Sequence, residues 1–218
     1  MLFLHEVHAA IGEREIELDD AVREVYAPSV ADDDTRLLWY LYATHGAGDA
    51  YHTVMITALR DGAAWERLSR RLRYGDLADW LVSLDPLTYT SHSTLMVSTD
   101  WSPLAELDLD SVPTQPVEHD VRVYREDTLE GAGIDAAVSR PAQRDDDVLT
   151  CIAGFRPFFA PEDTVRVLYR VGAPDVLEAA FGNDAGWGDW SGSVTPTLPG
   201  GVHESTRMLR NVPWSPLA

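Results

Sequence analysis

A five-residue motif occurs twice in the chain and constrains the fold more than any other feature. Trp101-Ser102-Pro103-Leu104-Ala105 recurs as Trp214-Ser215-Pro216-Leu217-Ala218, the last residues of the 218-residue sequence. Shorter matches keep the same order and nearly the same spacing: Arg60, Gly62 and Ala63 with Arg170, Gly172 and Ala173, Asp79-Trp80 with Asp189-Trp190, and Ser93-Thr94-x-Met96 with Ser205-Thr206-x-Met208. Self-similarity at a long, nearly constant period indicates a tandem duplication of about half the chain.

Both halves show the same predicted order of elements, βαββαβ. Alternating and β-branched runs predict strands, and apolar residues at helical spacing predict helices. In the first half the strands are 2–8, 36–44, 51–60 and 92–98, and the helices are 13–26 and 62–84. In the second half the strands are 120–125, 148–156, 164–170 and 205–210, and the helices are 131–138 and 173–181. An acidic segment with two prolines, 106–117, reads as a linker between a first repeat, 1–105, and a second, 118–218.

The βαββαβ order is that of a ferredoxin-like unit, whose helices cover one face of a four-stranded sheet. The other face must also be buried. We therefore predict an α+β fold, in which two tandem ferredoxin-like repeats pack sheet to sheet as an intrachain α+β barrel. Trp101 and Trp214 each follow a fourth strand, and we expect them to cap the barrel or to pack on the other half.

Particular residues resemble the dimeric α+β barrel superfamily, most closely proteins of the NIPSNAP type. They are Val121-Arg122-Val123-Tyr124, Glu6-Val7-His8 leading to Gly12, an aromatic second strand followed by a glycine turn, and a second helix ending near Trp80. The chain departs from the pattern by lacking a proline before Gly12. The resemblance implies a fold shared by cofactor-free monooxygenases, isomerases, cyclases, dehydratases and haem enzymes, so it does not select one reaction.

Charge and composition exclude several classes of partner. A net charge of −19 argues against nucleic acid and anionic membranes. From the sequence we expect neither a membrane span nor a signal peptide, and the single cysteine, Cys151, allows no intrachain disulfide. We expect a cytoplasmic protein that acts on a small molecule, either alone or as a homodimer.

The histidines and one glutamate of the first half are the candidate catalytic groups. Glu6 and His8 lie two apart on a strand and share a face, whereas His5 points to the other face. We predict His8, Glu6 and His52 as acid–base residues. A metal site of Glu6, His8 and His52 is conceivable, but no HxH or HxxxH spacing supports it, so no cofactor is expected. Binding of a single metal ion is not excluded, and neither is binding of haem, which some relatives contain. The axial ligand of a haem in the second half would be His119 or His203.

Arginines in the second half and tyrosines in the first are the candidate substrate-binding groups. Arg122, Arg166 and Arg207 fall within predicted strands that are adjacent in the ferredoxin-like order 4-1-3-2. They would form a row that binds an anionic group. Alternatively, they pair with acids of the first half, such as Glu6, or lie on an exposed edge. Tyr40, Tyr42 and Tyr51 would line a pocket for a hydrophobic or aromatic ligand, or serve as core or rim residues.

The preferred function is that of an isomerase, lyase or cofactor-independent oxygenase, which acts between the two sheets on a hydrophobic substrate with or without an anionic group. The alternative is a non-catalytic ligand-binding or assembly protein of the NIPSNAP type.

Overall fold

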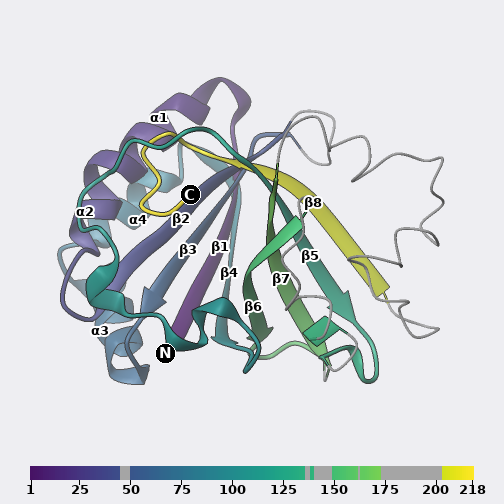
Figure 1. Cartoon of the computed structure of the whole chain (residues 1–218). Helices are drawn as coiled ribbons and strands as arrows, with labels where there is room; N and C mark the ends of the chain where they lie inside the picture. Colours follow the sequence, from purple (N-terminus) through teal and green to yellow (C-terminus); the bar gives the residue numbers. More distant parts are fainter. Residues whose placement is uncertain (45–49, 136–137, 140–148, 162, 173–202) are drawn as a thin grey trace. The chain divides into compact units, whose positions relative to one another are not determined.

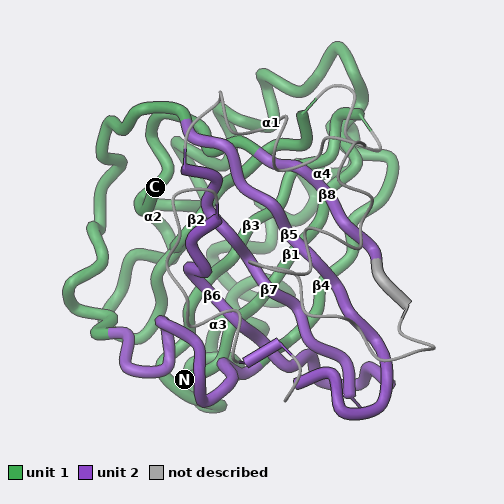
Figure 2. Tube along the Cα trace, turned by 45° about the vertical axis from the view of Figure 1, so that its right-hand side comes forward, with its two compact units in different colours: residues 1–96, 108–121, 210–218 green, residues 97–107, 122–209 purple. Residues whose placement is uncertain are grey.

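The computed structural model describes residues 1–44, 50–135, 138–139, 149–161, 163–172 and 203–218. The chain forms two compact units, which Figure 2 distinguishes by colour. Unit 1 comprises Met1–Met96, Asp108–Val121 and Arg210–Ala218, and unit 2 comprises Val97–Leu107 and Arg122–Leu209. No helix of the described residues is long and apolar enough to cross a membrane.

Unit 1 contains a sheet with its strands in the ferredoxin-like order β4-β1-β3-β2. The strands are β1 (Leu2–Ala10), β2 (Thr35–Ala43), β3 (His52–Leu59) and β4 (Thr88–Ser98). β1 and β2 both pair antiparallel with β3. The helices of this unit cover one face of the sheet (Figure 1): α1 (Glu15–Ala21), a π-helical turn (Val22–Tyr26), α2 (Ala27–Ser29), α3 (Gly62–Tyr74) and α4 (Ala78–Leu84).

The single helix expected over 62–84 is two helices, α3 and α4. The Asp61 side chain caps the start of α3 by accepting a hydrogen bond of 2.8 Å from the Ala64 amide. The helix ends at Gly75, where a Cβ atom would lie 2.9 Å from the Arg71 Cα atom. A residue with a side chain does not fit this close approach, so the break occurs at the glycine.

The core of unit 1 lies between the sheet and these helices. Its strand residues lie on one face of the sheet: Leu4, Ala10, Leu37, Tyr40, Met55 and Leu59. On β1 and β3 they are an even number of residues apart, and on β2 a register shift between Leu37 and Trp39 brings Leu37 and Tyr40 to the same face. They pack against buried helix residues, among them Leu18, Val22, Tyr26, Leu68 and Trp80. This is the helix-covered face of unit 1.

Unit 2 has the same strand order, β8-β5-β7-β6. Its strands are β5 (Val123–Glu130), β6 (Leu149–Pro157), β7 (Thr164–Val171) and β8 (His203–Asn211). β5 and β6 both pair antiparallel with β7. The predicted 4-1-3-2 order is thus confirmed in both units. The expected helix 173–181, part of the expected helix 131–138 and the expected turn 45–49 lie outside the described residues.

The two copies of the repeated motif make equivalent contacts. Ser215 Oγ accepts a hydrogen bond of 3.1 Å from the Tyr40 amide on β2, and Ser102 Oγ accepts one of 3.0 Å from the Gly154 amide on β6. Likewise, Trp214 Nε1 donates to Asp19 at 3.2 Å, and Trp101 Nε1 donates to Asp135 at 3.1 Å. The first copy belongs to unit 2 and the second to unit 1, so each packs on the other half, as expected.

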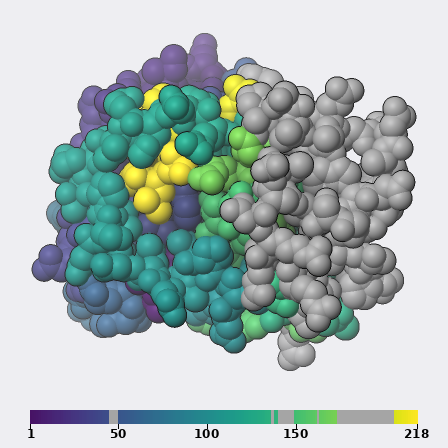
Figure 3. Space-filling model, viewed as in Figure 1, coloured from purple at the N-terminus to yellow at the C-terminus, as the bar shows by residue number. Residues whose placement is uncertain are grey.

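The compact units therefore do not follow the repeat boundaries at 105 and 118. The expected linker also packs, because its Leu109 and Val112 are buried. Residues 108–121 belong to unit 1, where the His119 amide donates to the Pro213 carbonyl at 2.7 Å. Figure 3 shows this teal segment beside the yellow C-terminal residues. Apolar side chains within an acidic, proline-containing sequence explain why the segment is held against the core.

Candidate acid–base site

Four of the predicted site residues lie together on the helix-covered face of unit 1. Strand register places Tyr42 opposite Thr53, and Thr53 opposite His8, in one row across β2, β3 and β1. In the neighbouring row, Tyr40 lies opposite Met55, which lies opposite Glu6. Directly paired residues of antiparallel strands are in side-chain contact range. The structure thus brings Glu6, His8, Tyr40 and Tyr42 into two adjacent rows.

Glu6 has the properties of a proton-transfer group. The Tyr26 hydroxyl donates to its Oε2 at 3.4 Å and lies 3.1 Å from Thr57 Oγ1. Burial raises the pKa of Glu6 to about 7, and the hydrogen bond from Tyr26 offsets part of this rise. A carboxyl with this pKa is present in both protonation states near neutral pH and can accept or return a proton.

Tyr26 was not among the predicted site residues, because in the helix pattern it counts only as an apolar position. It lies in the π-helical turn Val22–Tyr26, and its ring packs on Trp80 with the centroids 5.3 Å apart. Burial and the Glu6 carboxylate raise its pKa well above the ordinary value. Its phenol therefore remains a hydrogen-bond donor. The available sequence signal was a hydroxyl within an otherwise aliphatic stripe.

His8 is buried as a neutral imidazole. Its Nδ1 lies 2.8 Å from Ser91 Oγ, and its side chain is almost inaccessible. Burial lowers the pKa of His8 to about 4. Among the described residues, Nε2 has no hydrogen-bond partner although it is buried. An unsatisfied buried nitrogen is costly, and it leaves one atom available to a ligand or water.

Tyr40 presents a phenol that stays protonated. Its ring stacks on Trp214, with the centroids 5.2 Å apart and an interplanar angle of 24°. Burial raises the pKa of Tyr40 well above that of a free phenol, and the Thr53 hydroxyl offsets only part of the rise. The group can therefore donate a hydrogen bond at any physiological pH.

A pocket of about 370 Å³ opens at the end of the first row, beside Tyr42. It is lined by Glu15, Tyr42, Ala43, Thr44, Tyr51 and Arg210. Tyr51 adopts a φ of 62°, and a Cβ atom on Gly12 would lie 3.1 Å from its ring. Glycine at position 12 thus leaves space for the aromatic wall of the pocket.

Other predicted groups do not join this site. His52 pairs with Ala9 and so lies on the opposite face from Glu6 and His8, which separates the three conceivable metal ligands. No group of three or more histidine, cysteine or acidic residues in the described part of the chain is placed to hold a metal ion. Burial raises the pKa of the Cys151 thiol to about 12, so it stays protonated and is a poor nucleophile.

Of the two histidines considered as axial ligands in the second half, the structure describes the side chain of His119. His119 Nε2 lies 3.4 Å from the Pro216 carbonyl and donates to it, so that nitrogen is engaged. The side chain of His203 lies outside the described residues.

The predicted arginines lie in unit 2 and are only partly brought together. Arg207 on β8 forms an ion pair of 3.0 Å with Glu126 on β5. Arg166 on β7 is close enough to both groups for their charges to affect its pKa. Arg122 precedes β5 and is exposed. The acid that pairs with Arg207 therefore comes from the same half of the chain, and not from the first half.

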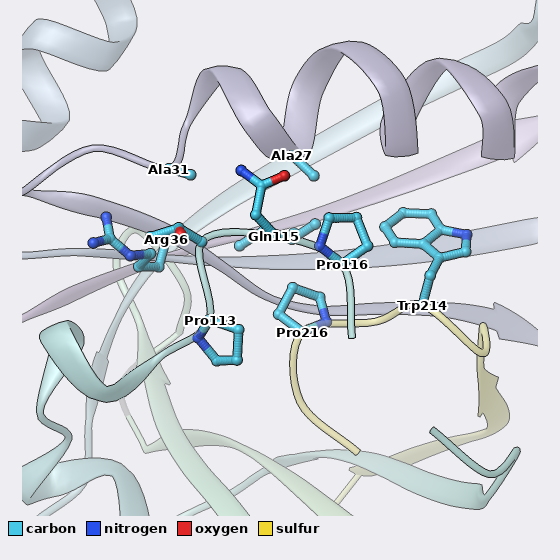
Figure 4. Close-up of a pocket in the computed structure, with 10 residues that line it drawn as sticks. Ala27, Ala31, Arg36, Pro113, Gln115, Pro116, Trp214 and Pro216 are labelled. Carbon is cyan, nitrogen blue, oxygen red and sulfur yellow. The ribbon is translucent and has the colours of Figure 1, made fainter. Parts of the chain in front are cut away.

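A second space in unit 1, beneath the C-terminal segment, is too small for a ligand. It is lined by Arg36, Trp214 and several prolines (Figure 4), and its volume is about 10 Å³. This is room for one water molecule at most. Arg36 Nε is buried without a partner among the described residues, so a water molecule there would satisfy it.

Comparison with known proteins gives structural matches only. No protein-family model and no curated protein matches the sequence. A candidate monooxygenase from Lactobacillus acidophilus matches with a TM-score of 0.57 at 11% identity, over 96% of this chain and 93% of its own. An anthrone oxidase-like protein matches with a TM-score of 0.53 at 11% identity, over 97% and 91%. A candidate chlorite dismutase matches with a TM-score of 0.53 at 12% identity, over 97% and 95%.

At these identities the likeness concerns the fold. It confirms the predicted α+β fold class.

Proposed function

We propose that this α+β barrel chain is a small-molecule enzyme that removes a proton from a hydrophobic substrate at the helix-covered face of unit 1. The observation that carries the proposal is the raised pKa of the Glu6 carboxyl. Burial raises this pKa to about 7, and the carboxyl accepts a hydrogen bond from the Tyr26 hydroxyl. Carboxyl groups with a pKa shifted toward neutral pH occur preferentially where a group must act as a general acid or base.

The neighbouring side chains have complementary roles. Glu6 as the carboxylate accepts the proton. The Tyr40 phenol donates a hydrogen bond to the oxygen on which negative charge develops, because its raised pKa keeps it protonated. His8, neutral and with Nε2 available, orients a substrate hydroxyl or carbonyl group. These roles suit a substrate whose carbanion is stabilised as an enolate or a phenolate.

The pocket beside Tyr42 supports a small, hydrophobic substrate. Its volume of about 370 Å³ is in the range of small-molecule sites. The rings of Tyr42 and Tyr51 favour an aromatic ligand, since aromatic surfaces stack with a geometric preference.

Cofactor-independent oxygenation is the reaction that we favour. The fold is shared with a candidate monooxygenase and an anthrone oxidase-like protein. In such a step, Glu6 takes a proton from an activated CH₂ group, and the resulting carbanion gives its electrons to O₂. The overall change converts CH₂ and O₂ to C=O and water, and it needs no external reductant. An isomerase or a lyase would use the same proton removal without consuming O₂.

Oxygen uptake with anthrone as the substrate tests the proposal. The wild type should consume O₂ and form the quinone, and Glu6→Gln should reduce the rate by roughly 100-fold or more, as expected for loss of a general base. Glu24→Gln is the matched control, because Glu24 is an exposed glutamate in the helical turn that carries Tyr26. Anaerobic exchange of the anthrone CH₂ protons with D₂O measures proton removal separately. Binding of anthrone with neither exchange nor uptake would favour the non-catalytic, NIPSNAP-type alternative.

A further inference from the structure

The sheet of unit 2 has one face that carries charged side chains. Alternate residues of β5 and β7, including Val123, Leu129, Val165 and Val167, form a hydrophobic cluster on one face. The residues between them point to the other face, which we call the arginine face of unit 2: Tyr124, Glu126, Thr128, Phe155, Arg166, Leu168, Arg170 and Arg207. This face is separate from the acid–base site and does not depend on the function proposed for it.

Arg166 is a partly buried cation of this face, and one of its buried nitrogens lacks a hydrogen-bond partner among the described residues. Its Nε donates to Thr128 Oγ1 at 3.2 Å. Its Nη1 is buried and has no hydrogen-bond partner among the described residues. Burial lowers its pKa, and the nearby Arg207 guanidinium lowers it further, whereas Glu126 opposes the shift. A buried guanidinium with a vacant donor is costly unless an anion completes its partners.

The acids near Arg166 do not supply that partner. Glu126 has a side chain that is 1% exposed, and its ion pair is with Arg207, at 3.0 Å between Nε and Oε2. One carboxylate thus lies near two guanidinium groups. An added anion would relieve the repulsion between Arg166 and Arg207, and the side chain of Arg207 is 30% exposed and can adjust to it.

The surroundings of Arg166 indicate what kind of anion fits. Strand register places Phe155 on β6 directly opposite Arg166, and Thr128 opposite it on the other side. The next residue of β7 on this face is Leu168. A planar guanidinium pairs with a carboxylate through two parallel hydrogen bonds. An apolar ring attached to that carboxylate would find Phe155 and Leu168 beside it.

We infer that the arginine face of unit 2 binds the carboxylate of a small aromatic acid, with Arg166 as the main binding group and Arg207 beside it. The Nη1 of Arg166, which has no partner among the described residues, donates to the carboxylate. Phe155 and Leu168 contact the ring.

Isothermal titration of the full-length protein with sodium benzoate tests the inference. The wild type should bind one equivalent saturably, and Arg166→Gln should weaken binding at least about tenfold, the effect of one charge-assisted hydrogen bond. Arg73→Gln is the control, since it removes the same charge from an exposed position of unit 1 and should leave the affinity within about twofold. Absence of saturable binding, or equal affinity of Arg166→Gln and wild type, overturns the inference.

Two further variants separate binding from folding. Arg166→Lys keeps the charge but loses the planar fork, so it should fold with an unchanged melting temperature and still bind benzoate more weakly. Glu126→Gln removes the competing carboxylate, so it should bind benzoate several-fold more tightly. Weaker binding by Glu126→Gln would contradict the inference. Inorganic phosphate is the second ligand, and phosphate binding as tight as benzoate binding would overturn the assignment of an aromatic carboxylate. Loss of benzoate binding should leave the oxygen uptake of unit 1 unchanged.

Discussion

The Tyr26 hydroxyl donates a hydrogen bond to Glu6 Oε2 at 3.4 Å and so connects a π-helical turn to the middle of the first strand. The contact stabilises the carboxylate form of Glu6 and only partly offsets the effect of burial. π-Helical turns often occur at functional sites, and this one places a phenol over the one acidic residue of β1. The proposed chemistry depends on this pair.

The raised pKa of Glu6 predicts a loss of stability as the pH rises toward neutrality. Between pH 4.5 and 7 the native carboxyl holds a proton that the unfolded chain has released, so the free energy of unfolding falls with increasing pH. The total effect is about 3 kcal/mol at most. Glu6→Gln should remove this slope and be the more stable protein at pH 8. Urea unfolding at a series of pH values measures it, and an unchanged slope in the variant would be inconsistent with the raised pKa.

The lowered pKa of His8 predicts a slope of the opposite sign. Between pH 6.5 and pH 4 the imidazole is protonated in the unfolded chain but not in the native protein. The free energy of unfolding therefore falls as the pH decreases. His8→Gln should remove this loss of stability at acidic pH, whatever the substitution does to stability at neutral pH. In the wild type the His8 and Glu6 contributions oppose one another between about pH 4.5 and 6.5, because each spans that range. In the same unfolding series, the stability of Glu6→Gln should therefore rise with pH over this range, and the stability of His8→Gln should fall.

Removing the Tyr26 hydroxyl should shift the pKa of Glu6 further upward. Tyr26→Phe keeps the ring on Trp80 but deletes the hydrogen bonds to Glu6 and Thr57. We expect the midpoint of the pH–rate profile to rise and the stability to fall by about 1–3 kcal/mol, since buried partners lose a hydrogen bond. A downward shift of the midpoint would show that Tyr26 does not stabilise the carboxylate.

Gly154 tests how closely the first motif copy packs on β6. A Cβ atom at this position would lie 2.3 Å from the Trp101 ring and 2.8 Å from Thr99 Oγ1. Gly154→Ala should therefore cost about 1–3 kcal/mol through overpacking. Gly62→Ala is the control, because nothing lies within 4 Å of the added atom. Thermal unfolding compares them, and the Gly154→Ala penalty should shrink in a Trp101→Leu background. A penalty independent of residue 101 would exclude the steric explanation.

Much of the fold could be predicted because it depends on local periodicity. The repeated pentapeptide and the alternation of strands such as 164–170 predict two βαββαβ units, and the observed strand orders match. The break at Gly75 could not be predicted, since apolar residues continue at helical spacing through it. That Trp101 and Trp214 each pack on the other half of the chain could be expected only in general terms, because a contact partner leaves no signal in local sequence.

The candidate site could be predicted in part. Two-residue spacing was enough to place Glu6 and His8 on one face, but the sequence did not show that this is the face beneath the helices. His52 was grouped with them, although strand register puts it on the other face. Tyr26 was missed because its hydroxyl makes its contacts through tertiary packing.

A ¹³C NMR titration of the Glu6 carboxyl carbon tests the central claim most directly. The protein would be labelled at its glutamate carboxyl carbons, and the Glu6 resonance would be assigned by its absence in Glu6→Gln. The structure predicts a midpoint near pH 7 for this resonance. A midpoint near the ordinary value of 4.5 would contradict the account, because Glu6 would then be a permanent carboxylate and too weak a base for the proposed reaction.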